Sequence, residues 1–208
     1  MTAPIKLYRN PKSGHCHRVE LMMSFLNVPY ETIDLDMANG AHKAPDYLKL
    51  APLGQVPAID DNGTVLSDSN GILAYLAATY GSDADWTGRT PVEKAQIQRW
   101  LSIAAGEIAS GPAAARLVTV FGAGLDQAAA QAKAHALFKV MDAELANRNH
   151  LIGDRMTLAD VSAYSYTAHA PEGGVHLDAY PNIQRWIAGI EAHPNFVGMA
   201  RSPIPDAA

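Results

Sequence analysis

Two short segments of the chain carry residue types that could bind a small polar molecule, Val56-Pro57 and Asp68-Ser69. A proline between an apolar residue and a strand-like run is compatible with a cis peptide bond, which would turn the backbone N–H and C=O of Val56 toward a peptide ligand. At a helix start the first N–H groups lack partners and attract anions, so Asp68 and Ser69 could receive an amine and a carboxylate. The two segments predict a pocket for a small peptide, although Asp68-Ser69 taken alone is more often a helix cap.

A run of metal-ligating residue types, His15-Cys16-His17, does not predict a metal site. Successive residues on a helix point about 100° apart, so these side chains cannot converge on one ion. Gly122-Ala123-Gly124 is a fragment of a nucleotide-binding loop without the strand that precedes such loops, and a turn between helices explains it better. We therefore expect neither a metal nor a nucleotide.

The composition excludes several classes of function. The 208 residues carry a formal net charge of -5 without any run of Lys or Arg, which argues against a nucleic-acid binder or a polybasic membrane anchor. The single cysteine, Cys16, excludes an intramolecular disulfide and a multi-cysteine zinc site, and it fits a reducing compartment. No apolar run approaches the roughly 20 residues of a membrane span. We expect a cytoplasmic protein whose partners are small molecules or proteins.

Hydrophobic spacing indicates how the candidate residues are positioned. Ile5 and Leu7 alternate with polar neighbours in a short strand. The segment that follows has helical spacing, with one apolar face made by Cys16, Val19, Met23 and Leu26. Residues 30–35 are predicted as a second strand, which completes a β-α-β unit. Strands at 56–60 and 64–67 flank the hairpin signal Asp61-Asn62-Gly63, and a helix begins at Ser69, so the sheet is expected to have four strands.

The second half of the chain is predicted to be all helical. Beyond Pro91, a favourable first helical residue, almost every segment has helical spacing, interrupted by Pro112 and Gly122. Thr157-Leu158-Ala159-Asp160 is a capping box that marks one helix start. We predict an α/β domain at residues 1–80, a linker at 81–90 and an all-helical domain at 91–208.

This order of elements and motifs resembles the cytosolic glutathione transferases over nearly the whole chain. The matching segments are Lys12-Ser13-Gly14-His15-Cys16, Gly40-Ala41-His42-Lys43, Pro52-Leu53-Gly54-Gln55-Val56-Pro57, Asp68-Ser69-Asn70-Gly71-Ile72-Leu73-Ala74-Tyr75-Leu76 and Thr157-Leu158-Ala159-Asp160. The resemblance implies a thioredoxin-like N-terminal domain and an all-α C-terminal domain. It also implies glutathione as co-substrate without a further cofactor, a small hydrophobic electrophile as second substrate, and a homodimer.

The resemblance assigns glutathione-binding roles to the first candidate residues. Val56 would pair its backbone with the cysteinyl part of glutathione, while cis-Pro57 holds the turn. Asp68 and Ser69 would bind the γ-glutamyl ammonium and carboxylate. The chain has Asp68 where many members of the family carry Glu, which keeps the charge and shortens the side chain by one methylene.

Three further residues, His42, Lys43 and Gln55, are assigned by the same resemblance to the glycyl end of glutathione, where a cation or an amide donor is useful. In the helical half, Arg116 and Phe121 are candidates for contacts with the electrophile.

Ser13 is the predicted catalytic residue. The thiolate is the nucleophilic form of a thiol whose ordinary pKa is about 8.5, so an enzyme must favour the anion. A hydroxyl donor beside the sulfur, together with the helix N-terminus after Gly14, would do so. By resemblance to the serine-type transferases, Ser13 lies in the loop that carries the activating hydroxyl. The simpler alternative is that Ser13 is only a helix N-cap.

Other assignments of the chemistry remain open. Cys16 could form mixed disulfides with glutathione in a disulfide or peroxide reductase, but it falls on the apolar helix face, which favours a buried structural thiol. Tyr8 could supply the hydroxyl, although it sits at the end of a strand. A protein that binds glutathione or another ligand without catalysis is also compatible with the fold. We expect a transferase that conjugates the glutathione thiolate to small apolar electrophiles.

Overall fold

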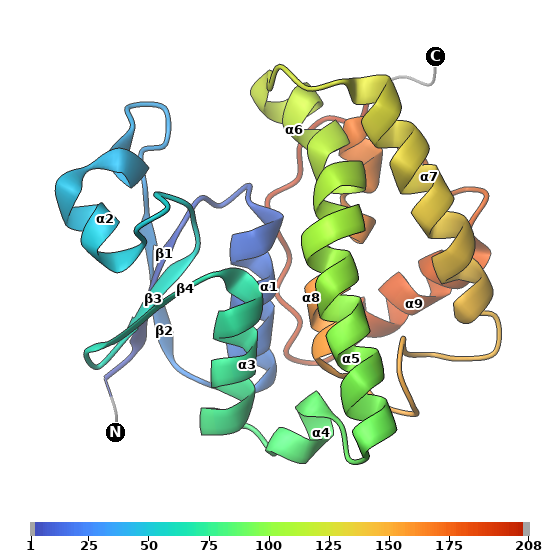
Figure 1. Cartoon of the computed structure of the whole chain (residues 1–208), viewed down its shortest axis with the longest axis horizontal. Coiled ribbons are helices and arrows are strands. Elements are labelled where there is room, and N and C mark those ends of the chain that lie inside the picture. The colour runs from blue at the N-terminus through green and yellow to red at the C-terminus, as the bar shows by residue number, and fades with distance from the viewer. Residues whose placement is uncertain (1–2, 206–208) are drawn as a thin grey trace. The chain divides into compact units, whose positions relative to one another are not determined.

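A four-stranded mixed sheet forms the first part of the structure, a computed structural model that describes residues 3–205 (Figure 1). The strands lie in the order β2-β1-β3-β4, with the bounds β1 Ile5–Arg9, β2 Tyr30–Asp34, β3 Ala58–Asp61 and β4 Thr64–Ser67. β1 and β2 are parallel and are joined by a helix, as parallel neighbours require, and β3 is antiparallel to both β1 and β4. The predicted β-α-β unit and four-stranded sheet are confirmed.

Two long helices of this part, α1 and α3, pack against each other beside the sheet (Figure 1). The helical elements are α1 Gly14–Phe25, the 3-10 turn η1 Ala41–Lys43, α2 Pro45–Leu50 and α3 Ser69–Tyr80. The short helix and the 3-10 turn lie in the connection between β2 and β3.

The burial of α1 extends beyond the apolar face that its spacing indicates. His17, Arg18 and Glu20 are buried together with the apolar residues of this helix. Arg18 contacts the start of α3, and Glu20 pairs with Arg9 of β1. His17 is covered by a segment from far along the chain, Asn195–Ala200, which packs with the first part of the structure. His17 Nε2 lies 2.8 Å from the Val197 carbonyl oxygen of that segment. The spacing of apolar residues within α1 cannot predict burial by a segment near the end of the sequence.

The hairpin between β3 and β4 has a two-residue turn. Asn62 and Gly63 both have positive φ, 51° and 93°, as a type I′ turn requires. β3 begins at Ala58, two residues later than the predicted strand start, and Asp61 belongs to the strand instead of the turn. Val56 therefore lies outside the ladder of sheet hydrogen bonds.

The remainder of the described chain is helical. The elements are α4 Asp83–Thr87, α5 Pro91–Ile103, η2 Ala104–Ala113, α6 Ala114–Phe121, α7 Gln127–Glu144, α8 Leu158–Ala168, the 3-10 turn η3 Ala170–Gly173 and α9 Pro181–Glu191. α4 falls inside the segment 81–90 that was predicted as a linker.

Pro112 does not end a helix, in contrast to the prediction. It lies inside η2, a π-helix that continues α5 and leads directly into α6. Proline has no N–H to donate and crowds the preceding turn of an α-helix, and the wider π-helical turn accommodates it. The helical run ends at Gly122, whose φ of 66° is left-handed.

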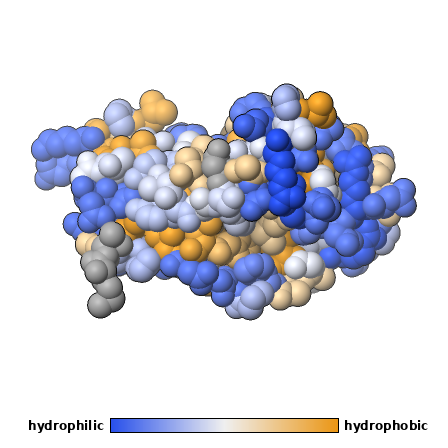
Figure 2. Space-filling view, turned by 90° about the horizontal axis from the view of Figure 1, so that it is seen from below, coloured by the Kyte–Doolittle hydropathy of each residue, from blue (hydrophilic) through white to orange (hydrophobic). Residues whose placement is uncertain are grey.

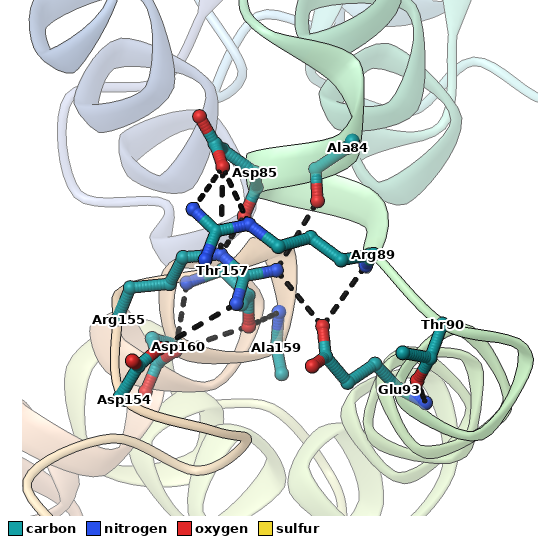
Figure 3. Close-up of polar contacts among 10 residues, drawn as sticks. All are labelled: Ala84, Asp85, Arg89, Thr90, Glu93, Asp154, Arg155, Thr157, Ala159 and Asp160. Carbon is teal, nitrogen blue, oxygen red and sulfur yellow. Dashed lines mark hydrogen bonds and ion pairs between the residues drawn. The ribbon is translucent and has the colours of Figure 1, made fainter.

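The predicted capping box at the start of α8 is confirmed. The backbone N–H of Thr157 donates to Asp160 Oδ2 at 2.9 Å, and the Thr157 hydroxyl accepts from Ala159 N–H at 3.3 Å (Figure 3). The neighbouring Arg155 donates from Nη2 to Glu93 Oε2 at 2.9 Å and from Nε to the Asp85 carbonyl at 2.9 Å (Figure 3). These bonds connect the loop before α8 with α4 and with the first turn of α5.

The chain divides into two units. The first runs to Asp83 and takes in Asn195–Ala200, and the second comprises Ala84–Pro194 and resumes at Arg201. A short C-terminal segment thus packs with the first unit although it follows the second in the sequence. Within residues 3–205, no helix is long and apolar enough to cross a membrane.

Candidate functional site

Three chain segments meet at one end of the sheet in the first unit. Tyr8 pairs with Ala58 across β1 and β3, so the loop that leaves β1 lies beside the loop that enters β3. The first turns of α1 and α3 also meet, because His15 Nδ1 lies 3.4 Å from Ser69 Oγ. The loop with Ser13, the Val56-Pro57 loop and the start of α3 are thereby brought together.

Ser13 is the N-cap of α1. Its backbone is extended, with φ -88° and ψ 119°, and its Oγ accepts a hydrogen bond from Cys16 N–H at 3.4 Å. At this distance the bond is weak. A hydroxyl that accepts one hydrogen bond can still donate its own proton. The side chain of Cys16 is one group within its reach. The residue is half-buried.

Cys16 is fully buried, with 0% of its surface exposed. Burial raises the pKa of its thiol to about 11, because a thiolate is poorly solvated in an apolar environment. The thiol is therefore protonated at neutral pH and is inaccessible to a disulfide or peroxide.

The Val56-Pro57 loop holds a peptide group outside the hydrogen bonds of the sheet. The peptide bond is cis, and Val56 is half-buried in a bend before β3. Among residues 3–205, nothing forms a hydrogen bond with the backbone N–H or C=O of Val56. Its side chain packs on the small core cluster around Tyr47, Ala51 and Ala58. An anchored side chain with both backbone groups available is the arrangement needed to pair with a peptide.

Asp68 and Ser69 occupy the N-terminus of α3. Asp68 is exposed and has φ 74°, a left-handed conformation that costs a non-glycine residue about 1–3 kcal/mol and is often found at functional sites. Its side chain accepts from Gly71 N–H at 2.9 Å, so it also caps the helix. Ser69, in contrast, is only 5% exposed.

His42, Lys43 and Gln55 are drawn together by contacts between two turns. Lys43 Nζ donates to the Leu53 carbonyl at 3.1 Å, and the Tyr47 hydroxyl donates to the Gln55 carbonyl at 2.7 Å. The side chains of Lys43 and Gln55 are exposed. The buried His42 Nδ1 has no hydrogen-bond partner in the described part of the chain. The polar side chains thus lie beside the Val56-Pro57 loop.

Sequence reasoning missed Arg18 and His15. Arg18 is 1% exposed, and its Nη1 donates to Asn70 Oδ1 at 3.0 Å and to Ser69 Oγ at 3.3 Å. Burial and the positive charge of Arg18 lower the pKa of His15 to about 3, so this imidazole is neutral. The available signal was a charged residue in the helix that follows the candidate loop.

The other candidates have different surroundings. Tyr8 is half-buried, and its ring lies 6.1 Å from that of Tyr47. Arg116 is buried and donates to Glu172 Oε2 at 2.6 Å, so it belongs to the interior of the second unit, whereas Phe121 is 46% exposed. Across residues 3–205 no group of three His, Cys, Asp or Glu side chains is placed to hold a metal ion.

A pocket of about 150 Å³ lies at the opposite end of the first unit. It is lined by Ala3, Ile5, Leu26, Asn27, Val28, Pro29 and Tyr80, at the start of β1 and the end of α3. Hydrophobic residues also gather on the left of the face seen from below (Figure 2). Because the candidate residues lie at the end of β1 and the start of α3, this pocket is not part of their site.

Family models match both parts of the chain. Residues 13–79 match the model described as the glutathione S-transferase N-terminal domain, and residues 122–194 match that of the glutathione S-transferase C-terminal domain.

Individual proteins are similar over almost the full length. Glutathione S-transferase 3 of Zea mays is 32% identical over 98% of this chain and 96% of the maize protein. Glutathione S-transferase GstB of Escherichia coli K12 is 29% identical over 91% of this chain and 94% of that protein. The crystal structure of a glutathione S-transferase from Pseudomonas fluorescens superposes with a TM-score of 0.87 at 28% identity, covering 95% of this chain and 99% of that one.

Proposed function

Because the chain belongs to the glutathione S-transferase family, we propose that it conjugates glutathione to small apolar electrophiles and that Ser13 stabilises the glutathione thiolate. The observation that carries the proposal is the position of the Ser13 hydroxyl, at the N-terminus of α1 and at the sheet end where Val56 and Ser69 also lie. A single site can then hold the peptide and ionise its sulfur.

The proposed chemistry needs one charge to be stabilised. The Ser13 hydroxyl donates to the sulfur, and the partial positive charge at the start of α1 adds to this hydrogen bond. If the thiol pKa falls by about two units, the anion is favoured by about 2.7 kcal/mol relative to free glutathione. The thiolate attacks an electrophilic carbon, a sulfur–carbon bond forms, and a leaving group departs with the bonding electrons.

The remaining candidate residues hold the tripeptide. The Val56 backbone pairs with the cysteinyl residue, and Asp68 and Ser69 take the γ-glutamyl ammonium and carboxylate at the start of α3. The glycyl carboxylate lies toward His42, Lys43 and Gln55. The unpartnered Val56 backbone, the left-handed Asp68 and the neighbouring turns support this assignment.

Two alternatives make different demands on the chain. A reductase would use Cys16, whose burial and raised pKa oppose a role as nucleophile. A non-catalytic binding protein would bind glutathione without lowering its pKa. We also propose that the chain is a homodimer, which sedimentation equilibrium would test against the 22.2 kDa mass of one chain.

Ultraviolet difference titration of the glutathione complex tests the proposal. The wild type should show the thiolate absorption band at neutral pH, and Ser13→Ala should move its midpoint up by about two pH units. Cys16→Ala is the matched control and should leave the band unchanged. Absence of the band in the wild type would favour the binding protein, and its loss in the cysteine variant alone would favour the reductase.

A further inference from the structure

A buried tyrosine of α2 supports the loop that carries Val56. Tyr47 is 5% exposed, and its ring belongs to the small core cluster on which the Val56 side chain packs. Its hydroxyl donates to the Gln55 carbonyl at 2.7 Å. Burial raises the pKa of this hydroxyl, so it remains protonated and able to donate at neutral pH. One residue therefore anchors the Val56 side chain and also binds the peptide group that precedes Val56.

The hydrogen bond from Tyr47 fixes the direction of the Val56 N–H. The Gln55 carbonyl and the Val56 N–H belong to one planar peptide unit, and in the usual trans form they point in opposite directions. Because Tyr47 holds the carbonyl on its own side of the loop, the N–H points to the other side. In the described part of the chain no group accepts a hydrogen bond from this N–H. It is therefore available to a carbonyl of a ligand.

Another side-chain hydrogen bond holds the same loop two residues earlier. Lys43 Nζ donates to the Leu53 carbonyl at 3.1 Å. The Gln55 carbonyl, in contrast, accepts from Tyr47 alone among the residues that the structure describes. Loss of the Tyr47 hydroxyl would therefore allow the peptide unit before Val56 to rotate, while the Lys43 bond still holds the start of the loop.

We infer that Tyr47 is a positioning residue, which acts through the peptide unit between Gln55 and Val56 and directs the Val56 N–H toward the cysteinyl carbonyl of glutathione. This role rests on the proposed function and adds to it a hydroxyl that does not touch the ligand. A peptide N–H that is already held in the bound direction loses less conformational freedom on binding than one that can rotate. The Tyr47 hydroxyl should therefore contribute to the affinity only for ligands that carry this carbonyl.

Calorimetric titration of Tyr47→Phe with three ligands tests this role. The ligands are glutathione, γ-glutamyl-cysteinamide, and γ-glutamyl-cysteamine, which differs from the second ligand only by lacking the carboxamide and so has no cysteinyl carbonyl. The variant should bind the first two ligands about fivefold more weakly, the loss expected from one neutral hydrogen bond. It should bind the third ligand as tightly as the wild type does. The KM for glutathione should rise by a similar factor while kcat at saturation is preserved.

Tyr75→Phe is the matched control, because it removes a hydroxyl of the first unit that also donates over 2.7 Å, to Asp61 Oδ2 outside the candidate site. It should leave all three affinities unchanged. Equal losses for the two truncated ligands in Tyr47→Phe, or unchanged binding of glutathione, would overturn the inference. If that variant does not fold, Tyr47→Met replaces it with the same expected results. A wild type that binds none of the three ligands would instead refute the proposed function.

Discussion

The Ser13 hydroxyl has two tasks that use different parts of the same group. As the N-cap of α1 it accepts from Cys16 N–H, and as the proposed thiolate ligand it donates its proton. The two roles are compatible in the geometry, and therefore the N-cap interpretation does not compete with the catalytic one. Substitutions that retain one role and remove the other can separate them.

We expect Ser13→Ala to lose both roles and Ser13→Asp to lose only catalysis. Aspartate is a good N-cap but cannot donate at neutral pH, and its charge repels a thiolate. Each variant should lower kcat/KM with an activated aryl chloride by about 100-fold, since about 2.7 kcal/mol of anion stabilisation is lost. Steady-state kinetics and urea denaturation check the two roles.

Stability provides the contrast between these variants. Ser13→Ala should reduce the free energy of unfolding by about 1 kcal/mol, and Ser13→Asp should not. Ser13→Thr keeps the hydroxyl and should retain much of the activity. An active alanine variant would show that another group, such as Tyr8, ionises the thiol.

At the scale of elements, the contact between η3 and α6 depends on a glycine. A Cβ added at Gly173 would lie 2.6 Å from the Arg116 backbone nitrogen and 2.8 Å from the Ala115 carbonyl carbon. Backbone atoms cannot rotate away, so Gly173→Ala should destabilise the protein by about 1–3 kcal/mol, as overpacking of a core does. Urea denaturation measures the change.

Gly189→Ala is the matched control for that substitution. At Gly189, in α9, an added Cβ meets no described atom within 4 Å, and alanine is the better helix former by about 1 kcal/mol. This variant should be as stable as the wild type or more so. Equal destabilisation by both substitutions would contradict the steric argument.

The carboxylate of Asp61 in β3 forms hydrogen bonds with two tyrosines of α3, and these bonds should make the stability of the first unit depend on pH. Asp61 Oδ2 accepts from the Tyr75 hydroxyl at 2.7 Å and from the Tyr80 hydroxyl at 2.5 Å. Burial raises the pKa of Asp61, but hydrogen bonds from Tyr80 and Tyr75 outweigh it and hold the pKa below its ordinary value of 3.8. A lowered folded-state pKa stabilises the protein above the ordinary value, and this contribution is lost as pH falls through the folded-state pKa.

Asp61→Asn should therefore be less stable than the wild type at neutral pH, by roughly 1–3 kcal/mol, the usual value of hydrogen bonds to a charged group. The difference should shrink as the pH falls below 3.8, where the wild-type carboxyl also becomes neutral. Urea denaturation of both proteins across this range measures it. Asp46→Asn removes an exposed ion pair and should have little effect. A difference that stays constant in acid would refute the assignment.

The sequence predicted elements better where the signal was local. The Asn62-Gly63 turn and the capping box at Thr157 depend on residues within one turn, and both were found. The burial of α1 and the passage of the helix through Pro112 depend on distant neighbours and on a change of helical register. Spacing alone cannot supply either.

At the scale of the whole molecule, family membership and fold class were predictable because the motifs occur in a fixed order. The thioredoxin-like N-terminal domain and the helical C-terminal domain are confirmed by the sheet, the helices and the family models. The position of Arg18 beside Ser69 was not predictable. Its contact with Ser69 joins residues that are 51 positions apart in the sequence, and no sequence motif indicates this contact. The binding roles of individual residues stay predictions.

Ligand-linked stability tests the site in the intact protein. A ligand that binds only the folded state raises the free energy of unfolding by about 2.7 kcal/mol when present at about 100 times its Kd. Glutathione should do so, as followed by scanning calorimetry, whereas cysteinyl-glycine should stabilise far less because it lacks the γ-glutamyl group that Asp68 and Ser69 are proposed to hold.

The shape of the calorimetric transition shows how far this stabilisation spreads. All residues that are proposed to bind glutathione lie in the first unit. If the two units unfold in separate transitions, glutathione should therefore raise the midpoint temperature of the first unit alone. A single transition that moves as a whole would show that the units unfold together. Equal stabilisation by glutathione and cysteinyl-glycine would contradict the proposed γ-glutamyl site, because the start of α3 would then contribute nothing to binding.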